Sequence, residues 1–375
     1  MNRFSYLDYN ATAPVRPAVI VAMQEILESV GNPSSVHRSG REARRALEHA
    51  RGLVATAVGA APAQVVFTSG GTEANNQALR AERGPVAVSA IEHESVLAAA
   101  PDAVRIPVDA EGRLDLTALE QELARTSPAL VSVMLANNET GVIQPLRAVV
   151  EVAHRQGVRV HCDAVQAGGK LAIDMDALGV DLLTLSAHKL GGPQGVGALV
   201  VGKGLEPEAL LRGGGQERRW RPGTENLPGI VGFGRACELA MADADWWQRT
   251  AALRDRLEAR LTALAPAARV FGRGAERLPN TSCITMPGVS NHTQLIEFDL
   301  AGIAVSTGSA CSSGKVGPSH VLAVMGVEPG VAASAIRISL GWASTANEVE
   351  HLVDAWGRLY ARTRRPANDA LARPA

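Results

Sequence analysis

One lysine stands between two strand-like runs and is followed by a glycine-rich turn. Lys189 lies in residues 186–197, with an apolar run at 180–185 before this segment and another at 198–201 after it. Both runs have the length and side-chain branching of buried strands. A lysine at the end of a buried strand is costly unless its charge is compensated, and one established use of such a lysine is as a Schiff-base amine. The alternative is that Lys189 extends from a loop into solvent.

A phosphate-binding turn and a buried carboxylate accompany this lysine. Residues 69–72 (Ser-Gly-Gly-Thr) follow a strand-like run and open a helix, so their free backbone N–H groups suit a phosphate, to which Ser186 and His188 can add donors. Asp163 follows another apolar run, where a lone carboxylate requires a cation such as a protonated pyridine nitrogen. With Lys189 these are the parts of a site for pyridoxal phosphate (PLP), whose ring accepts electrons from a carbanion. Taken singly, the glycines indicate only a turn and Asp163 only a helix cap.

Three more side chains could take part in chemistry. His93 could stack on the PLP ring or move protons, although a single histidine is more often structural. Cys311 lies among small residues at 305–315, which indicates an exposed, mobile thiol. Arg337 lies in a predicted strand and could hold a substrate carboxylate, with a surface ion pair as the alternative.

Composition limits the class of protein. The chain has 375 residues, 46% of them hydrophobic and 20% charged, which is ordinary for a soluble globular protein of two domains. A net charge of −1 argues against nucleic-acid or anionic-membrane binding. We find no membrane-spanning run and no signal peptide. The four cysteines are scattered and suit neither a zinc site nor a disulfide scaffold; they are Cys162, Cys237, Cys283 and Cys311. We therefore expect a cytoplasmic protein without a resident metal.

The elements that position these side chains alternate along the chain. Strands are predicted at 65–68, 86–89, 104–106, 130–134, 158–163, 180–185 and 198–201, with helices at 18–29, 39–58, 116–125 and 146–156 and a helix opening near 71. This alternation predicts a mostly parallel sheet covered by helices, in which function gathers at the carboxyl ends of the strands. A helical stretch at 228–264 is predicted to lead into a second domain, which has strands at 281–286, 303–306 and 335–340 and a closing helix at 347–363.

Ten short motifs, taken together and in this order, resemble the cysteine desulfurases of iron–sulfur cluster biogenesis, the NifS/IscS type of class V aminotransferase-like proteins. They lie at 6–12, 31–35, 67–73, 92–93, 137–141, 163–166, 186–189, 221–224, 308–311 and 336–339, nearly the whole chain. The resemblance implies an α/β protein of PLP-dependent transferase fold type I (aspartate aminotransferase-like). It has a mostly parallel seven-stranded sheet in a large domain (15–255), a smaller α+β domain (1–14 with 256–365) and a flexible tail (366–375).

The resemblance also implies roles for individual residues. Lys189 is the Schiff-base lysine, His93 stacks on the ring, Asp163 meets the pyridine nitrogen and Gln166 meets the phenolate oxygen. The phosphate is held by Gly71, Thr72, Ser186 and His188, joined by Thr224 from the other subunit of a homodimer. Asn138 and Arg337 hold the carboxylate of L-cysteine.

Cys311 is implied to be the sulfur acceptor, which leaves a persulfide on the enzyme and releases L-alanine. The spacing from Cys311 to Pro318 resembles the subgroup with a longer, flexible nucleophile loop, in which the thiol can contact a transient iron–sulfur cluster on a partner. The implied partner is an iron–sulfur scaffold or another sulfur-acceptor protein. Gln216 and Pro222 depart from the pattern, and we expect them to shift the geometry of the glycine loop and the phosphate contact between subunits slightly.

Three other functions are weighed against this one. Selenocysteine lyase activity uses the same groups on another substrate. A sulfur-carrier or scaffold subunit would not need Lys189, Asp163 and Cys311 to be intact. Nucleotide binding at 191–197 is disfavoured because the glycine spacing does not fit the dinucleotide fingerprint.

Overall fold

The chain divides into two compact units in a computed structural model that describes residues 4–243, 245–308 and 318–364. The large unit comprises Thr12–Asn137 and Val142–Ala244, and the small unit comprises Met1–Ala11, Asn138–Gly141 and Asp245–Ala375. The two units meet in sequence at Asp245, whereas the predicted domains meet at 255. The segment Asn138–Gly141 belongs to the small unit. The domain boundaries drawn from the sequence stay a prediction.

A seven-stranded sheet forms the centre of the large unit. Its order is β2-β8-β7-β6-β5-β3-β4; β8 runs antiparallel to both β2 and β7, and the other neighbouring strands run parallel. The strands are β2 (Val65–Thr68), β3 (Val86–Ser89), β4 (Val104–Ile106), β5 (Leu130–Met134), β6 (Arg159–Asp163), β7 (Leu182–Ser186) and β8 (Gly197–Val201). Every residue of β2, β5, β7 and β8 is buried, as the continuous apolar runs require. The predicted mostly parallel sheet is therefore confirmed.

Three polar side chains in the interior of this sheet form a line of buried hydrogen bonds. Ser132 Oγ lies 2.8 Å from His161 Nδ1, and His161 Nε2 lies 3.0 Å from Thr184 Oγ1. All three residues are fully buried. Burial lowers the pKa of His161 to about 4, so the ring is neutral near pH 7.

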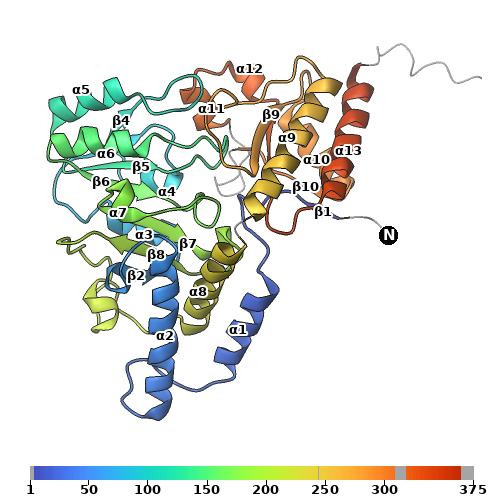
Figure 1. Cartoon of the computed structure of the whole chain (residues 1–375). Coiled ribbons are helices and arrows are strands. Elements are labelled where there is room, and N and C mark those ends of the chain that lie inside the picture. The colour runs from blue at the N-terminus through green and yellow to red at the C-terminus, as the bar shows by residue number, and fades with distance from the viewer. Residues whose placement is uncertain (1–3, 244, 309–317, 365–375) are drawn as a thin grey trace, which may run out of the picture. The chain divides into compact units, whose positions relative to one another are not determined.

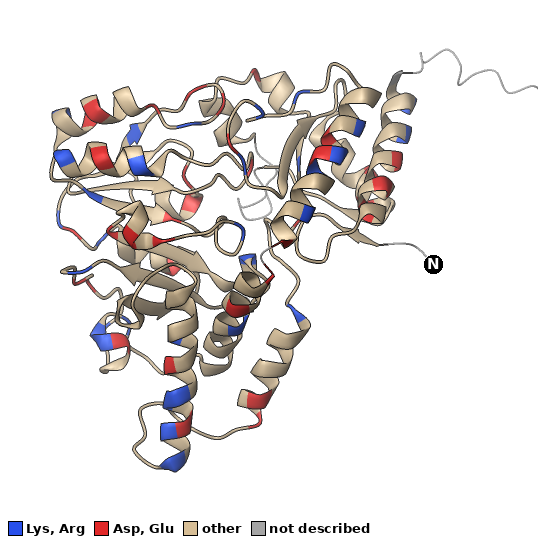
Figure 2. Ribbon diagram, viewed as in Figure 1, with Lys and Arg blue, Asp and Glu red and all other residues tan. Residues whose placement is uncertain are grey.

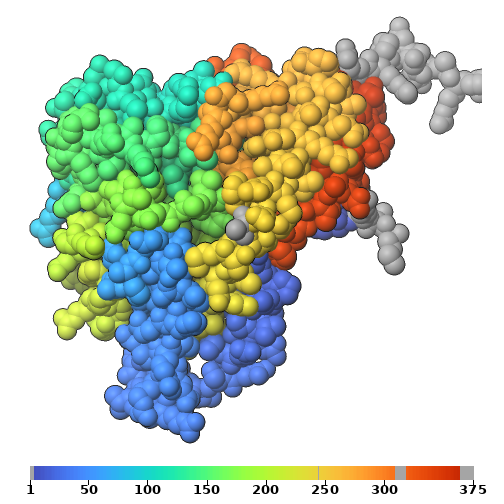
Figure 3. Space-filling view, viewed as in Figure 1, coloured from blue at the N-terminus to red at the C-terminus, as the bar shows by residue number. Residues whose placement is uncertain are grey.

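Helices surround the sheet in the large unit. They are α1 (Pro17–Leu27), α2 (Arg38–Thr56), α3 (Gly71–Ala78), α4 (Glu94–Leu97), α5 (Leu116–Thr126), α6 (Leu146–Arg155), α7 (Met175–Leu178) and α8 (Leu227–Ala242). Helix α8 packs against both α1 and α2 (Figure 1). Helix α2 buries Leu47 and Val54 and carries residues of both charges along its length (Figure 2). Its exposed Arg38 pairs with the exposed Glu42. Its surface faces the solvent in the space-filling view (Figure 3).

The small unit is built on short strands and three longer helices. Strand β11 (Ala335–Ser339) pairs antiparallel with β9 (Thr281–Thr285), and β1 (Ser5–Tyr6) pairs parallel with β10 (Ile303–Ala304). The helices are α9 (Trp246–Leu264), α10 (Asn291–Leu300), α11 (His320–Val324), α12 (Pro329–Ala332) and α13 (Ala346–Arg364). One apolar cluster, which includes Phe298, Ile336 and Trp356, joins strands β9, β10 and β11 with helices α9, α10 and α13.

Two local expectations differ from the structure. The helical stretch 228–264 is interrupted between α8 and α9, because Asp243 leaves the helical conformation (φ −97°, ψ 67°). Residues 6–17 are rich in turn formers and are expected to be irregular, but Tyr6 belongs to β1, which forms because its backbone pairs with β10 far along the chain. Among the described helices, none combines the length and the apolar character needed to cross a membrane.

Candidate active site

A buried carboxylate ends strand β6 in the large unit. Asp163 is 5% exposed; its Oδ1 accepts from the Val165 backbone N–H at 2.9 Å and its Oδ2 accepts from Asn75 Nδ2 at 2.7 Å. No lysine or arginine of the described residues forms an ion pair with it. Burial and the nearby Asp163 charge raise the pKa of Glu92 well above its ordinary value. A carboxylate in this setting suits a cationic ligand.

The residues predicted to form a phosphate cup adjoin one another. Helix α3 begins at Gly71, and its N-cap residue, Gly70, gives the first turn no side-chain cap. A Cβ added at Gly71 would lie 2.9 Å from Val165 Cγ2 and 3.6 Å from Ser186 Cβ, so Gly71 lies directly against Ser186 at the end of β7. Thr72, in the first turn, is exposed. This helix end therefore offers backbone N–H groups and two hydroxyls to an anion.

Lys189 lies at the end of the short 3-10 helix η2 (Ala187–Lys189), directly after β7. Burial and the neighbouring charges of Lys189 and Lys170 lower the pKa of His188 to about 4. His188 Nδ1 lies 3.2 Å from Thr12 Oγ1. Lys170 is 3% exposed, and its Nζ donates to Gln166 Oε1 at 3.0 Å. Positive charge therefore gathers around His188.

The segment leading to Thr224 is held in an unusual conformation. Three successive residues of the η3 turn (Gln216–Arg219), namely Glu217, Arg218 and Arg219, have positive φ angles of 44°, 58° and 69°. Such residues persist only where surrounding contacts hold them. Here Glu217 forms a buried two-point ion pair with Arg51, at 2.6 and 2.8 Å, and accepts from the Phe67 N–H at 2.9 Å.

The two departures from the family pattern are Gln216, which begins this turn, and Pro222, which follows it. Gln216 Oε1 accepts from the Gly223 N–H at 3.2 Å, and Pro222 is buried. Arg221 Nε donates to Glu73 Oε1 at 3.0 Å, which links this segment to α3. Thr224 itself is exposed. Its contact with a phosphate stays a prediction about a second subunit.

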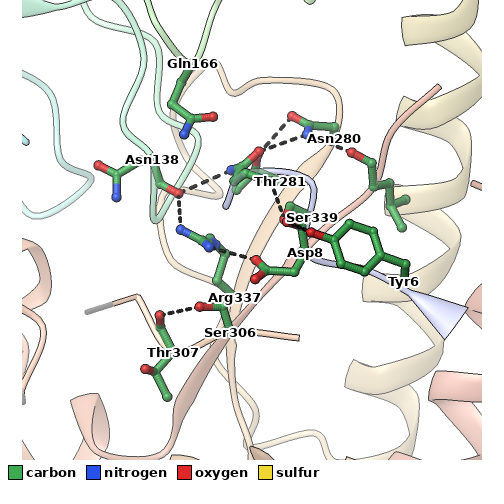
Figure 4. A network of polar contacts seen from close by, with 12 residues as sticks. Tyr6, Asp8, Asn138, Gln166, Asn280, Thr281, Ser306, Thr307, Arg337 and Ser339 are labelled. Atoms are coloured by element: carbon green, nitrogen blue, oxygen red, sulfur yellow. Dashed lines mark hydrogen bonds and ion pairs between the residues drawn. The ribbon is translucent and has the colours of Figure 1, made fainter. Parts of the chain in front are cut away.

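Arg337, in β11 of the small unit, is a buried cation. It is 1% exposed; Nη2 donates to Asp8 Oδ1 at 2.8 Å and Nη1 donates to the Asn138 carbonyl oxygen at 3.1 Å (Figure 4). Asn10 Nδ2 donates to the same carbonyl and to Thr281 Oγ1, which fixes the Asn138 backbone. The surface ion pair considered from the sequence is wrong, because this pair is buried.

One donor of Arg337 is unused. Its Nε is buried and has no hydrogen-bond partner among the described residues. An arginine offers a planar fork of donors that matches a carboxylate. Because Asp8 already holds the guanidinium in place, the Nε–H of Arg337 can donate a hydrogen bond to an acidic ligand.

Cys311 lies outside the described residues, within residues 309–317 (the Cys311 segment). Both described flanks of this segment lie against Glu139 of the small unit. Ser319 Oγ donates to Glu139 Oε2 at 2.5 Å, and a Cβ added at Gly308 would overlap the same oxygen. Burial raises the pKa of Glu139.

His93 caps a helix. Its Nδ1 accepts from the Ser95 backbone N–H at 3.1 Å at the start of α4 and lies 2.8 Å from Ser95 Oγ. Ser95 Oγ also accepts from Asn75 Nδ2 at 2.9 Å, and the same amide nitrogen reaches Asp163. The structure therefore connects two predicted site residues, His93 and Asp163, through Asn75 and Ser95.

Sequence reasoning missed four side chains. Asn75 and Ser95 lie next to predicted motifs, at 67–73 and 92–93, but carry no signature of their own. Lys170 follows Gln166 by four residues, a spacing that could have suggested contact had a helix been expected there. Glu139 lies inside the motif 137–141, but no sequence signal connects it with residues near 308 and 319.

The chain is similar to known proteins of the family that its motifs resemble. The family model for aminotransferase class-V matches residues 5–352. A cysteine desulfurase of Cereibacter sphaeroides is 46% identical over 93% of this chain and 94% of its own length. Cysteine desulfurase IscS of Dictyoglomus turgidum is 40% identical over 97% and 96%. The X-ray structure of a NifS-like protein from Rickettsia africae superposes with a TM-score of 0.90 at 36% identity, covering 96% of this chain and 100% of that one.

These matches define a class V aminotransferase with the PLP-dependent fold type I, as the resemblance implied. The chain belongs to the cysteine desulfurases of the NifS/IscS type within that family. The prediction of the family and of the fold is confirmed.

The described residues fit the cofactor of this family. A buried carboxylate without a described cationic partner suits a pyridinium nitrogen. An uncapped helix start beside Ser186 suits a phosphate. A lysine directly after a buried strand suits an aldehyde.

Proposed function

We propose that this protein is a PLP-dependent cysteine desulfurase that converts L-cysteine into L-alanine and an enzyme-bound persulfide. The observation that carries the proposal is Asp163, a buried carboxylate with two neutral donors and no described lysine or arginine in an ion pair. The names of the relatives support L-cysteine as the substrate. No described residue favours selenocysteine over cysteine.

When bound, PLP would supply an aldehyde that captures amines and a ring that delocalises electrons from the substrate. Asp163 would meet its pyridine nitrogen, His93 its ring face and Gln166 its phenolate oxygen. Lys189 would bond to the aldehyde. The phosphate would be held by Gly71, Thr72, Ser186 and His188.

The pKa of His188 defines its part in this set. Because burial and the neighbouring lysines lower this pKa to about 4, the ring is neutral at pH 7. A neutral imidazole donates through one nitrogen only. His188 would therefore contribute a hydrogen bond to the phosphate, and the nearby charge would come from Lys170 and Lys189.

The chain's own residues would carry the remaining steps. Arg337 would hold the substrate carboxylate through its unused Nε, assisted by the side chain of Asn138. Lys189 would take the α-proton once its amine is no longer bonded to the aldehyde. The Cys311 thiolate would attack the substrate sulfur, so that a new S–S bond forms as the C–S bond breaks. The electron pair would stay on the β-carbon, which gains a proton and leaves as the methyl group of L-alanine.

A second copy of this chain is proposed to complete the enzyme. Helix α1 exposes apolar side chains, with Ile20 54% and Leu27 68% exposed. They line a hollow of about 520 Å³ together with Met23 and residues 192–194. A large exposed apolar patch typically marks an interaction surface. A homodimer would cover it and would bring Thr224 to the phosphate of the other subunit.

The persulfide sulfur would pass to a scaffold for iron–sulfur clusters or to another sulfur-acceptor protein. The flanks of the Cys311 segment rest on Glu139, which would anchor the segment during this delivery. The cytoplasmic location stays a prediction.

Replacing Cys311→Ala tests the proposal. The purified variant should keep the yellow absorbance of bound PLP and should lose release of L-alanine from L-cysteine. Cys237→Ala is the matched control, because that thiol is buried and its pKa is raised to about 12 by burial, so it carries no reactive thiolate. Turnover that survives Cys311→Ala would rule out the persulfide role, and a colourless wild-type protein would rule out the cofactor.

A further inference from the structure

Four side chains of the large unit form one continuous line of hydrogen bonds. Asp163 Oδ2 accepts from Asn75 Nδ2 at 2.7 Å, and the same nitrogen donates to Ser95 Oγ at 2.9 Å. Ser95 Oγ lies 2.8 Å from His93 Nδ1. Asn75 and Ser95 are 1% and 9% exposed, so water competes little with these bonds. The line joins the two residues proposed to lie at the ring nitrogen and the ring face.

Each bond in this line has only one chemically consistent direction. A carboxylate accepts hydrogen bonds, so the NH₂ group of Asn75 must face Asp163. That nitrogen carries two hydrogens, and the second one goes to Ser95 Oγ. The Ser95 hydroxyl therefore accepts from Asn75 and is free to donate its own hydrogen to His93 Nδ1.

The backbone of Ser95 supplies a second and longer hydrogen bond to the same nitrogen, so the tautomer rests on both donors together. The Ser95 N–H, which can only donate, also points at His93 Nδ1, at 3.1 Å. Nδ1 thus accepts from two donors of the same residue and cannot carry a proton. A neutral imidazole with an unprotonated Nδ1 carries its proton on Nε2.

We propose that Asn75 and Ser95 are positioning residues that hold His93 as a neutral ring with its proton on Nε2. This inference rests on the proposed function, in which His93 contacts the cofactor ring. In this form His93 presents an apolar face for stacking and one hydrogen-bond donor. Its basic nitrogen is turned toward Ser95, so the ring does not act as a proton acceptor on the substrate side.

A purely structural cap would use the backbone bond alone. His37 supplies that comparison, because its Nδ1 caps α2 by accepting from the Gly40 N–H at 3.2 Å, and no serine hydroxyl within the described ranges forms a hydrogen bond with it. Both histidines can be observed in the same spectrum. The hydroxyl of Ser95 and the amide of Asn75 are what distinguish His93.

The first test reads the tautomer directly. The full-length PLP-bound protein, labelled with ¹⁵N at histidine and free of cysteine, is examined by long-range ¹H–¹⁵N NMR, with His93→Gln assigning the signal. We expect an unprotonated Nδ1 and a protonated Nε2 for His93. A protonated Nδ1 would overturn the proposal, whether or not the protein desulfurates cysteine, so the two hypotheses fail separately.

The second test removes the hydroxyl. Ser95→Ala should raise the Nδ1–H fraction of His93 severalfold, leave His37 unchanged and lower kcat for alanine release about fivefold, the factor that one neutral hydrogen bond contributes. Ser95→Thr keeps the hydroxyl and should restore both readouts. Ser290→Ala, which removes the serine cap of α10 in the small unit, is the matched control and should change neither.

Two results of this second test would contradict the inference. An unchanged His93 signal in Ser95→Ala would show that the hydroxyl does not set the tautomer. A changed signal with an unchanged kcat would show that the tautomer does not matter for turnover. If Ser95→Ala does not fold, the wild-type and Ser95→Thr spectra still decide the tautomer.

Discussion

Replacing Arg337 by lysine should weaken the binding of cysteine without abolishing turnover. Lysine keeps the positive charge beside Asp8 but loses the planar fork, including the unused Nε. A hydrogen bond to a charged group contributes about 1.5–3 kcal/mol, and about 1.4 kcal/mol corresponds to a factor of ten. We therefore expect KM for L-cysteine to rise by about 10- to 150-fold in Arg337→Lys.

The effect should appear in KM, with kcat changed by less than about threefold. The carboxylate is remote from the sulfur that reacts, so its contact is equally strong in the ground state and the transition state, and losing such a contact raises KM alone. The assay is release of L-alanine over a range of cysteine concentrations. The carboxylate-free analogue cysteamine should inhibit wild type and Arg337→Lys with similar affinity.

Arg277→Lys provides the matched control. Arg277 also forms a buried two-point ion pair in the small unit, with Glu258 at 2.8 and 3.0 Å, but it has no proposed ligand. Both variants should unfold at a lower temperature than wild type, and only Arg337→Lys should raise KM. An equal rise in KM in both variants, or a KM within twofold of wild type in Arg337→Lys, would refute the carboxylate role.

Two further predictions concern stability and assembly. The pKa of His161 is lowered to about 4 in the folded protein, so the unfolded chain binds a proton below pH 6.5 that the folded chain binds only near pH 4. The contribution of His161 to the free energy of unfolding is therefore fully present above pH 6.5 and is lost as the pH falls from 6.5 to 4. At 1.36 kcal/mol per pH unit, the loss is roughly 3 kcal/mol. The free energy of unfolding, measured with urea, should fall by this amount more in wild type than in His161→Asn over the same pH range. The opposite contribution of Glu92, whose pKa is raised, is common to both proteins and cancels in the comparison. Curves of unfolding free energy against pH that run parallel for the two proteins would contradict the assignment. Adding charge to α1 with Ile20→Glu and Leu27→Glu should shift sedimentation from dimer to monomer, while Ile296→Glu, at a side chain 50% exposed in the small unit, should not. A dimer that persists in the α1 variant places the interface elsewhere.

The central sheet could be predicted because its signal is local. Runs such as 130–134 and 180–185 are apolar and branched, and strands buried on both faces require such residues. The break between α8 and α9 had no comparable signal, since the residues around Asp243 do not include a glycine or proline that would end a helix. Strand β1 was missed for a related reason, because two residues pair only through a strand about 300 positions away.

The same distinction applies to the candidate site: some of its features follow from local sequence, and others depend on contacts between distant positions. The motifs by themselves determined the family, and they placed Lys189, Asp163 and Gly71 at strand ends, because the order of residues along a chain records which chemical groups follow which strands. Only the tertiary structure decided that Arg337 is buried with an unused donor, that Glu139 touches both flanks of the Cys311 segment, and that Asn75 connects Asp163 with Ser95. Burial and hydrogen-bond direction depend on groups that come together from distant positions in the chain, and no local sequence pattern predicts those contacts.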